Sequence, residues 1–308
     1  MIVLIIVIVV FAALGVLFIV SFVKSKGLYD DYVESLDKKE YSFKDLIPIG
    51  LFINGKFNAR KVIPRGIYKY SYIYENEIKN RISELYGVKY ASYYLMIHNG
   101  NKTAVSLTLA AGAALLSVIT GIQGDKVNCM FFLFASFAFL IGMHFLLDKS
   151  LNDKIKKRRI AIQMEFPDFI NKLTLLVNAG MTISKAWEKI VVDNTKDTPL
   201  YNEMSYALGE IRAGKPEAVA YEEFGRRCKV KEIVRFVSVI ILNLKKGGSD
   251  VVPMLKVQAT ECWEMRKNAA RQLGEEAATK ILIPLMIMFV GIVILVATPA
   301  LMSFTSGM

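Results

Sequence analysis

Hydrophobic residues are gathered into four long blocks, and the polar residues lie between them. Residues 2–23, 103–123, 127–147 and 281–304 contain no Asp, Glu, Lys or Arg. Each block exceeds the roughly 18 residues that indicate a transmembrane helix, because about 20 residues at 1.5 Å each span the hydrocarbon core. We therefore expect four transmembrane helices, at residues 1–23, within a hairpin at 103–147, and at 281–304. Asp125 and Lys126 form the hairpin tip.

The first block could instead be a secretory signal. That interpretation requires a basic stretch before the block and a small-residue cleavage site after it. Neither is present, and the basic residues Lys24 and Lys26 follow the block. We expect a retained membrane anchor.

Two polar segments, residues 24–102 and 148–280, are both basic and carry all of the net charge of +11. A hairpin between them places both segments on the same side of the membrane. The run "KSLNDKIKKRR" after the third span puts that side in the cytoplasm, because positive residues stay inside. The sequence thus predicts a multi-pass protein of the cell (inner) membrane with both termini outside.

The segment 148–280 has the apolar spacing of amphipathic helices, as in "EFPDFINKLTLLVNAGMTISKAWEKIV". We expect six helices, at 152–178, 182–193, 199–212, 216–228, 231–246 and 250–280. Gly180 would end one helix and Thr182 would cap the next. Gly247, Gly248 and Ser249 repeat this pattern 67 residues later. Two such hairpins predict an all-α, antiparallel helical bundle.

The segment 24–102 is less regular, with a short helix expected at 75–86. Its many tyrosines could line a nucleic-acid surface. Tyrosine beside a membrane is more often an interfacial residue, and we expect no nucleic-acid partner.

The chain lacks the patterns that carry chemistry. It has no P-loop, no GxGxxG, no HExxH and no GxSxG, and its two histidines, His98 and His144, cannot form a metal cluster or a triad. The three cysteines have no metal-binding or disulfide spacing. We expect no catalytic residue, cofactor or metal, and therefore no enzyme. The expected spans also contain no Asp, Glu, Lys or Arg of the kind that coupled transporters bury.

The motifs, in their order, resemble the type II secretion system F family. They are "EFPDFINKLTLLVNAGMTISKAW", "GGSDVVPML" and "ARQLGEEAATKILIPLMIMFVGIVILVATPAL". Within that family they are most similar to the C-type platform protein of tight-adherence (Tad) pilus systems. The resemblance covers about residues 150–304. One departure is Val290-Gly291, where relatives often have a proline.

The resemblance implies a platform in the inner membrane that lies between a cytoplasmic hexameric secretion ATPase and the pilins. It also implies a second, B-type platform subunit and a homo- or hetero-oligomer. Coupling of the ATPase to pilin assembly or protein export is the expected function. The alternative is a small polytopic membrane receptor or transporter with a regulatory cytoplasmic helical domain.

The last motif contains a proline at the expected boundary between the bundle and the membrane. No helix breaker precedes Pro284 between Trp263 and Ile283. Proline cannot donate a hydrogen bond within a helix, so Pro284 would kink the helix at this joint. It could couple motor movement to the membrane, or it could simply begin the span.

Overall fold

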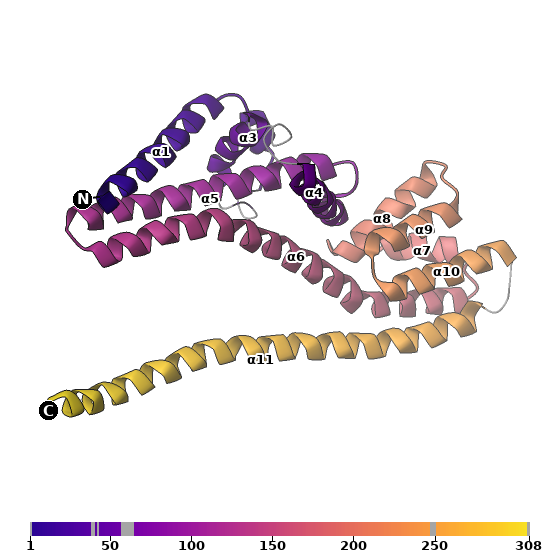
Figure 1. The fold of residues 1–308 in the computed structure, drawn as a ribbon. Coiled ribbons are helices and arrows are strands. Elements are labelled where there is room, and N and C mark those ends of the chain that lie inside the picture. The colour runs from indigo at the N-terminus through magenta and orange to yellow at the C-terminus, as the bar shows by residue number, and fades with distance from the viewer. Residues whose placement is uncertain (1, 38–40, 42, 57–64, 247–250, 307–308) are drawn as a thin grey trace. The chain divides into compact units, whose positions relative to one another are not determined.

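The computed structural model describes residues 2–37, 41, 43–56, 65–246 and 251–306, and every regular element in those ranges is a helix (Figure 1). In chain order they are α1 (Ile2–Ser25), α2 (Asp30–Glu34), the 3-10 helix η1 (Lys44–Leu46), α3 (Ile47–Lys56), α4 (Arg65–Tyr86), α5 (Ala91–Ile122), α6 (Lys126–Asn178), α7 (Ile183–Val192), α8 (Pro199–Arg212), α9 (Glu217–Cys228), α10 (Lys231–Lys246) and α11 (Val251–Ser306). The expected all-α fold is confirmed. Among these helices, α1, α5, α6 and α11 are long and apolar enough to cross a membrane.

The chain divides into two compact units, Met1–Lys156 and Lys157–Met308. Helix α6 passes from one unit into the other, because it continues without a break from the third apolar block into the polar segment. The structure therefore has no interruption at residue 148, where the sequence analysis began its bundle.

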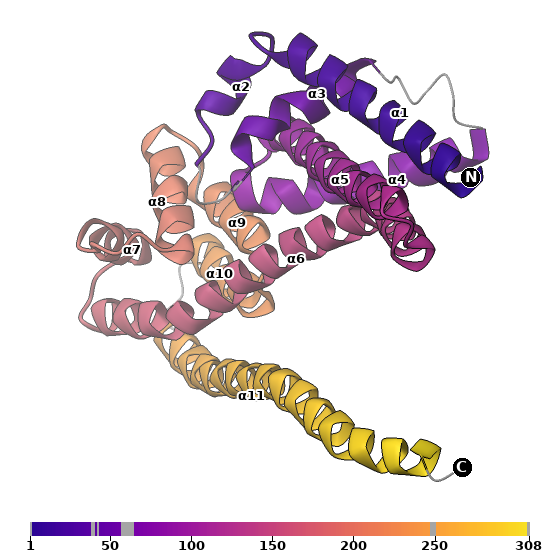
Figure 2. The ribbon, with the colours of Figure 1, turned by 90° about the vertical axis from the view of Figure 1, so that its left-hand side faces the viewer.

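In the first unit, α1, α3 and α4 all pack on α5 (Figure 2). The short apolar helix α3 approaches α5 most closely at two glycines. A Cβ atom built on Gly50 would lie 1.9 Å from the carbonyl oxygen of Gly100, which no real side chain could tolerate. Because neither glycine carries a side chain, the backbones of α3 and α5 can touch at this point.

Helices α5 and α6 form the expected hairpin. At its tip, Oδ1 of Asp125 accepts hydrogen bonds of 3.1 Å from the backbone N–H groups of Val127 and Asn128, which caps the start of α6. Within the apolar stretch, Ser117 Oγ donates to the carbonyl oxygen of Cys129 at 2.7 Å. The Ser117 contact satisfies a buried hydroxyl and links α5 to α6.

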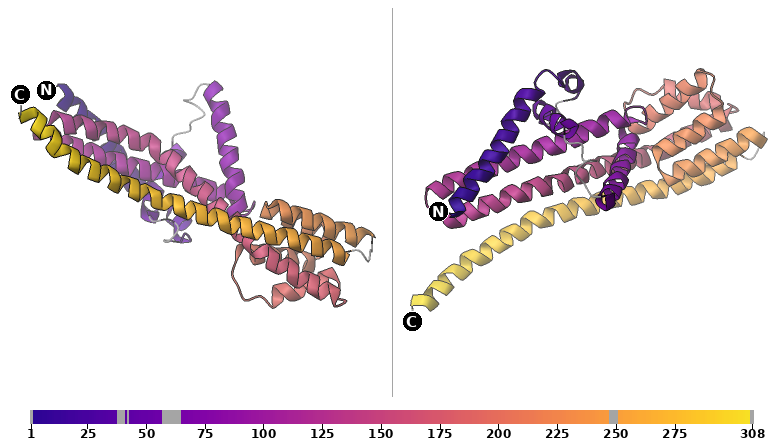
Figure 3. Two further views of the ribbon diagram at one scale, coloured as in Figure 1. Left: turned by 90° about the horizontal axis from the view of Figure 1, so that it is seen from below. Right: turned by 45° about the horizontal axis from the view of Figure 1, so that its top comes forward.

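In the second unit, the end of α6, helices α7 to α10 and the start of α11 enclose one hydrophobic core. Short turns join successive helices from α6 to α10, which makes these neighbours antiparallel. Figure 3 shows α10 lying beside the first turns of α11. The bounds of the six predicted helices agree with the structure to within two residues, except that α6 begins earlier and α11 ends later.

Two helices in the first unit are longer than expected. Helix α4 begins at Arg65 and not at 75, and α5 begins at Ala91, twelve residues before the expected span. The sequence criterion for α5 counted only uncharged residues, so it stopped at Lys102. Helical structure continues beyond that charge because Leu95 and Ile97 are buried within the unit.

Candidate functional site

The turn between α6 and α7 is built by Gly180 and Thr182. Gly180 has a φ of +94°, in the left-handed region that favours glycine. The N–H of Gly180 donates to the carbonyl oxygen of Val177 at 3.0 Å, and that of Met181 to Leu176 at 3.1 Å, which together close the helix end. Thr182 Oγ1 then accepts from the N–H of Lys185 at 3.4 Å and caps α7. Gly247, Gly248 and Ser249 lie outside the described residues.

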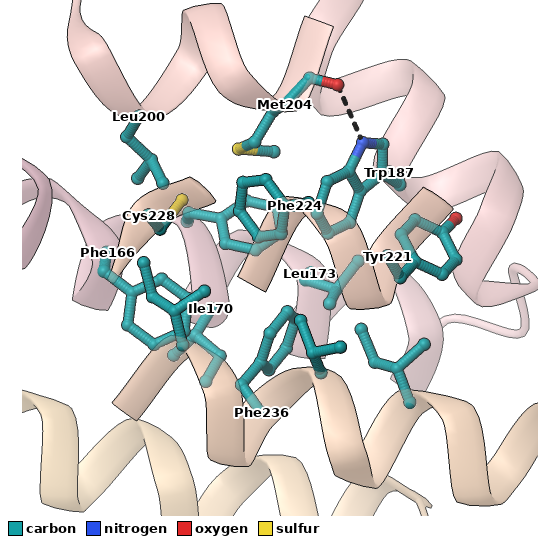
Figure 4. Packing of buried hydrophobic residues seen from close by; sticks show 14 of the residues in the cluster. Phe166, Ile170, Leu173, Trp187, Leu200, Met204, Tyr221, Phe224, Cys228 and Phe236 are labelled. Carbon is teal, nitrogen blue, oxygen red and sulfur yellow. Dashed lines mark hydrogen bonds between the residues drawn. The ribbon is translucent and has the colours of Figure 1, made fainter. Parts of the chain in front are cut away.

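Trp187 on α7 stands at the centre of the core (Figure 4). Its ring lies 5.1 Å, centroid to centroid, from Phe169 on α6, and 4.8 Å and 5.1 Å from Tyr221 and Phe224 on α9. Nε1 donates to the carbonyl oxygen of Met204 at 3.4 Å, so the buried indole N–H has a partner. The apolar stripes of α6 and α7 therefore form the centre of the second unit's core.

A chain of charged side chains ties α6, α8 and α9 together. Both oxygens of Glu203 are used, one by Arg158 Nη2 and the other by Arg227 Nε, each at 2.7 Å. Arg227 also reaches Glu210 at 3.3 Å, and its guanidinium lies 4.5 Å from the ring centroid of Tyr206. Arginine suits such a position because its planar fork can bind two carboxylates and stack on a ring.

The chain of charges continues at the turn before α9. Lys215 Nζ donates to Glu210 at 2.7 Å and to Glu223 at 2.5 Å. These hydrogen bonds raise the pKa of Lys215 above its ordinary value, and the bond from Lys215 lowers the pKa of Glu223 below its ordinary value. Both groups are therefore charged at neutral pH, and the network positions the α8–α9 turn.

Helix α11 connects the core to the fourth apolar block. Leu255 and Cys262 lie in the core, whereas residues 281–296 are exposed within the unit. Figure 3 shows α11 as one continuous, gently curved helix, and it passes Pro284 without interruption. The kink expected at Pro284 therefore does not interrupt the helix at this joint.

The first unit contains a buried polar cluster that the sequence analysis missed. His98 Nε2 lies 2.9 Å from Asp148 Oδ1, and Lys102 Nζ pairs with the same carboxylate. Lys102 also donates to the hydroxyl of Tyr74 at 3.0 Å. Only 3% of Lys102 is exposed. The signal was present in the sequence, since Lys102 and Asp148 are the first charges beyond the same end of two antiparallel blocks.

This cluster holds α5 and α6 together at the end of their apolar stretches. A buried charge requires a partner, and the loss of one member would leave the other uncompensated. Within the described part of the chain, no three His, Cys, Asp or Glu side chains are grouped as a metal ion requires.

The fold defines a class: a multi-span, all-helical membrane protein whose last span is continuous with a helical bundle. Residues 169–299 match the family model of type II secretion system (T2SS) protein F, so the chain carries a protein F domain of the type II secretion system. This match confirms the family resemblance, and it includes Gly180, Trp187 and Pro284. Comparisons with curated proteins and with solved structures each gave no match.

Proposed function

We propose that this chain is a platform protein of the cytoplasmic membrane in a Tad-like pilus or secretion machine, and that it couples a cytoplasmic secretion ATPase to pilin assembly or protein export. The observation that carries the proposal is α11. Within the protein F match, one helix contributes Leu255 and Cys262 to the bundle core and then continues through the fourth apolar block. A displacement of the bundle would move the span, because no flexible linker separates them.

The orientation belongs to the same proposal. The basic run after the third span favours a cytoplasmic bundle, and the hairpin tip at Asp125 then faces outside with the two termini. In this orientation the bundle lies in the cytoplasm, where ATP is available to a motor.

The proposed partners are a hexameric secretion ATPase, a B-type platform subunit and the pilins. The protein F match favours this assembly over a receptor or a transporter with a regulatory domain, since members of the family are membrane platform proteins and not enzymes.

Co-purification tests the proposal. The full chain in a maltoside detergent would be mixed with a hexameric secretion ATPase from the same organism and captured without nucleotide, with ADP and with a non-hydrolysable ATP analogue. We expect specific capture in at least one state. An unrelated basic multi-span protein serves as the control for charge. Equal capture by that control, or capture in none of the three states, would contradict the proposal.

A further inference from the structure

The first unit contains a pocket lined by tyrosines, and it lies outside residues 169–299, which match the protein F family. The pocket, of about 590 Å³, opens between α2, the end of α4 and the start of α5. It is lined by Asp31, Tyr32, Ser35, Tyr86, Tyr90, Tyr93 and Tyr94. Five of seven lining residues are tyrosines, and the one charged group is a carboxylate. Its volume lies within the usual range for small-ligand sites, roughly 300–1,000 Å³.

The rings are held in fixed positions. Tyr86 and Tyr94 stack with 3.7 Å between their centroids, and Tyr93 meets Tyr94 edge to face at 5.1 Å. The hydroxyl of Tyr93 donates to the carbonyl oxygen of Tyr32 and lies 3.2 Å from Ser35 Oγ. A pocket whose walls are already ordered loses little conformational entropy when a ligand binds.

The electrostatics of the lining select a cation. The faces of aromatic rings carry negative charge density and attract ammonium and guanidinium groups. Asp31 adds a full negative charge, and it makes no hydrogen bond or ion pair with another described residue. Lys89, which does not line the pocket, already places its Nζ 5.5 Å from the centroid of the Tyr90 ring.

The position of the pocket favours a ligand from water. Tyr90 and Tyr94 precede Lys102 on α5 by eight to twelve residues, or roughly 12–18 Å along the helix. The headgroup layer extends only about 5–8 Å beyond the hydrocarbon. For a span that begins at residue 103, as the uncharged block predicts, and that crosses the bilayer upright, these tyrosines lie beyond the headgroup layer.

We propose that this tyrosine pocket binds a water-borne organic cation, an alkylammonium or guanidinium group, with the rings enclosing the cation and Asp31 neutralising its charge. Free organic cations and basic side chains both carry such a group, and the same chemistry recognises both. This inference is independent of the ATPase-coupling proposal.

Matched pairs of probes test it. Saturation-transfer NMR titrations of the full chain in maltoside micelles would compare choline with 3,3-dimethyl-1-butanol, in which carbon replaces the charged nitrogen. N-acetyl-arginine amide would be compared with the neutral N-acetyl-citrulline amide. We expect at least one cation to bind about tenfold more tightly than its neutral partner. Tighter binding of choline points to a free cation, and tighter binding of the arginine derivative to a side chain. Equal binding within both pairs, or no binding, would overturn the proposal.

Variants localise the site. Asp31→Asn and Tyr90→Leu should each weaken cation binding about fivefold. Asp153→Asn and Tyr72→Leu remove an exposed carboxylate and an exposed ring that do not line the pocket, and should leave binding unchanged. An equal loss in these controls would contradict the assignment.

A further experiment tests whether the cation that fills the pocket is a lipid headgroup. Choline binding would be measured in nanodiscs of phosphatidylglycerol and of phosphatidylcholine. We expect the same affinity in both. Loss of choline binding only in phosphatidylcholine would show that a lipid headgroup fills the pocket, and a water-borne ligand would then be ruled out.

Discussion

At the scale of single residues, Gly180 shows how one backbone angle ends a helix. Its φ of +94° is open to glycine and costly for a β-branched residue, although no atom lies within 4 Å of the Cβ position. The constraint is therefore conformational and not steric crowding by neighbours.

Gly180→Val should lower the free energy of unfolding of the bundle by roughly 1 kcal/mol or more. Urea unfolding in detergent, followed by tryptophan fluorescence, measures this, since Trp187 and Trp263 both lie in the second unit. Gly209→Val is the matched control, because Gly209 is a helical position in α8 with open space around it. The interpretation fails if the two variants unfold alike.

The Lys215–Glu223 ion pair makes the stability of the bundle depend on pH. The folded-state pKa of Glu223 lies below its ordinary value of 4.5, so its contribution to stability is present above pH 4.5 and is lost as the pH falls through the lower folded value. The pKa of Lys215 lies above 10.5, so its contribution is present below pH 10.5 and is lost as the pH rises further.

Lys215→Met should therefore lower the melting temperature at pH 7, and the difference from the unmodified chain should shrink as the pH falls below 4.5. Lys172→Met, which removes an exposed lysine on α6, controls for the change in net charge. If the difference in melting temperature between Lys215→Met and the unmodified chain stays constant from pH 7 to pH 3, the Lys215–Glu223 pair is not the cause of the destabilisation.

At the scale of elements, the crossing of α3 and α5 depends on Gly50. Gly50→Ala would force the helices apart, because its Cβ would collide with backbone atoms that cannot rotate away. We expect a loss of about 1–3 kcal/mol, the usual cost of overpacking. Gly112→Ala on α5 meets nothing within 4 Å and should be neutral. Thermal unfolding in detergent compares the two, and equal melting temperatures would refute the close crossing.

The bundle helices were predictable because each is amphipathic and ends at a local signal. Phe169 and Trp187 fall on the buried stripes that the spacing marks, and Gly180 and Pro199 mark ends. In the first unit, α1, the α5–α6 hairpin and the end of α4 were predicted. Helix α3 and the start of α4 were not, because they lack such signals, and α3 packs on α5 through contacts distant in sequence. The His98–Asp148 contact and the tyrosine pocket likewise depend on tertiary structure, so composition alone suggested only a membrane interface.

At the scale of the whole molecule, the orientation of the chain in the membrane is a prediction that cysteine labelling can test. Lys126→Cys at the hairpin tip should react with a membrane-impermeant maleimide from outside intact cells, whereas Lys156→Cys beyond the third span should react only after lysis. The native cysteines contribute little background because all three are buried. The reverse pattern would place the bundle outside and contradict the proposed function.

The coupling role proposed for α11 depends on helix continuity between the core and the span. A Gly-Ser insertion after Lys280 would replace a stiff connection by one that absorbs motion, because such linkers behave as flexible coils. We expect membrane insertion and ATPase binding to persist while pilus assembly or secretion is lost. The same insertion between Gly124 and Asp125, in a turn that is not helical, should preserve assembly. If the chain with a flexible insert after Lys280 still assembles pili or secretes normally, the rigid helix does not transmit the motor's movement.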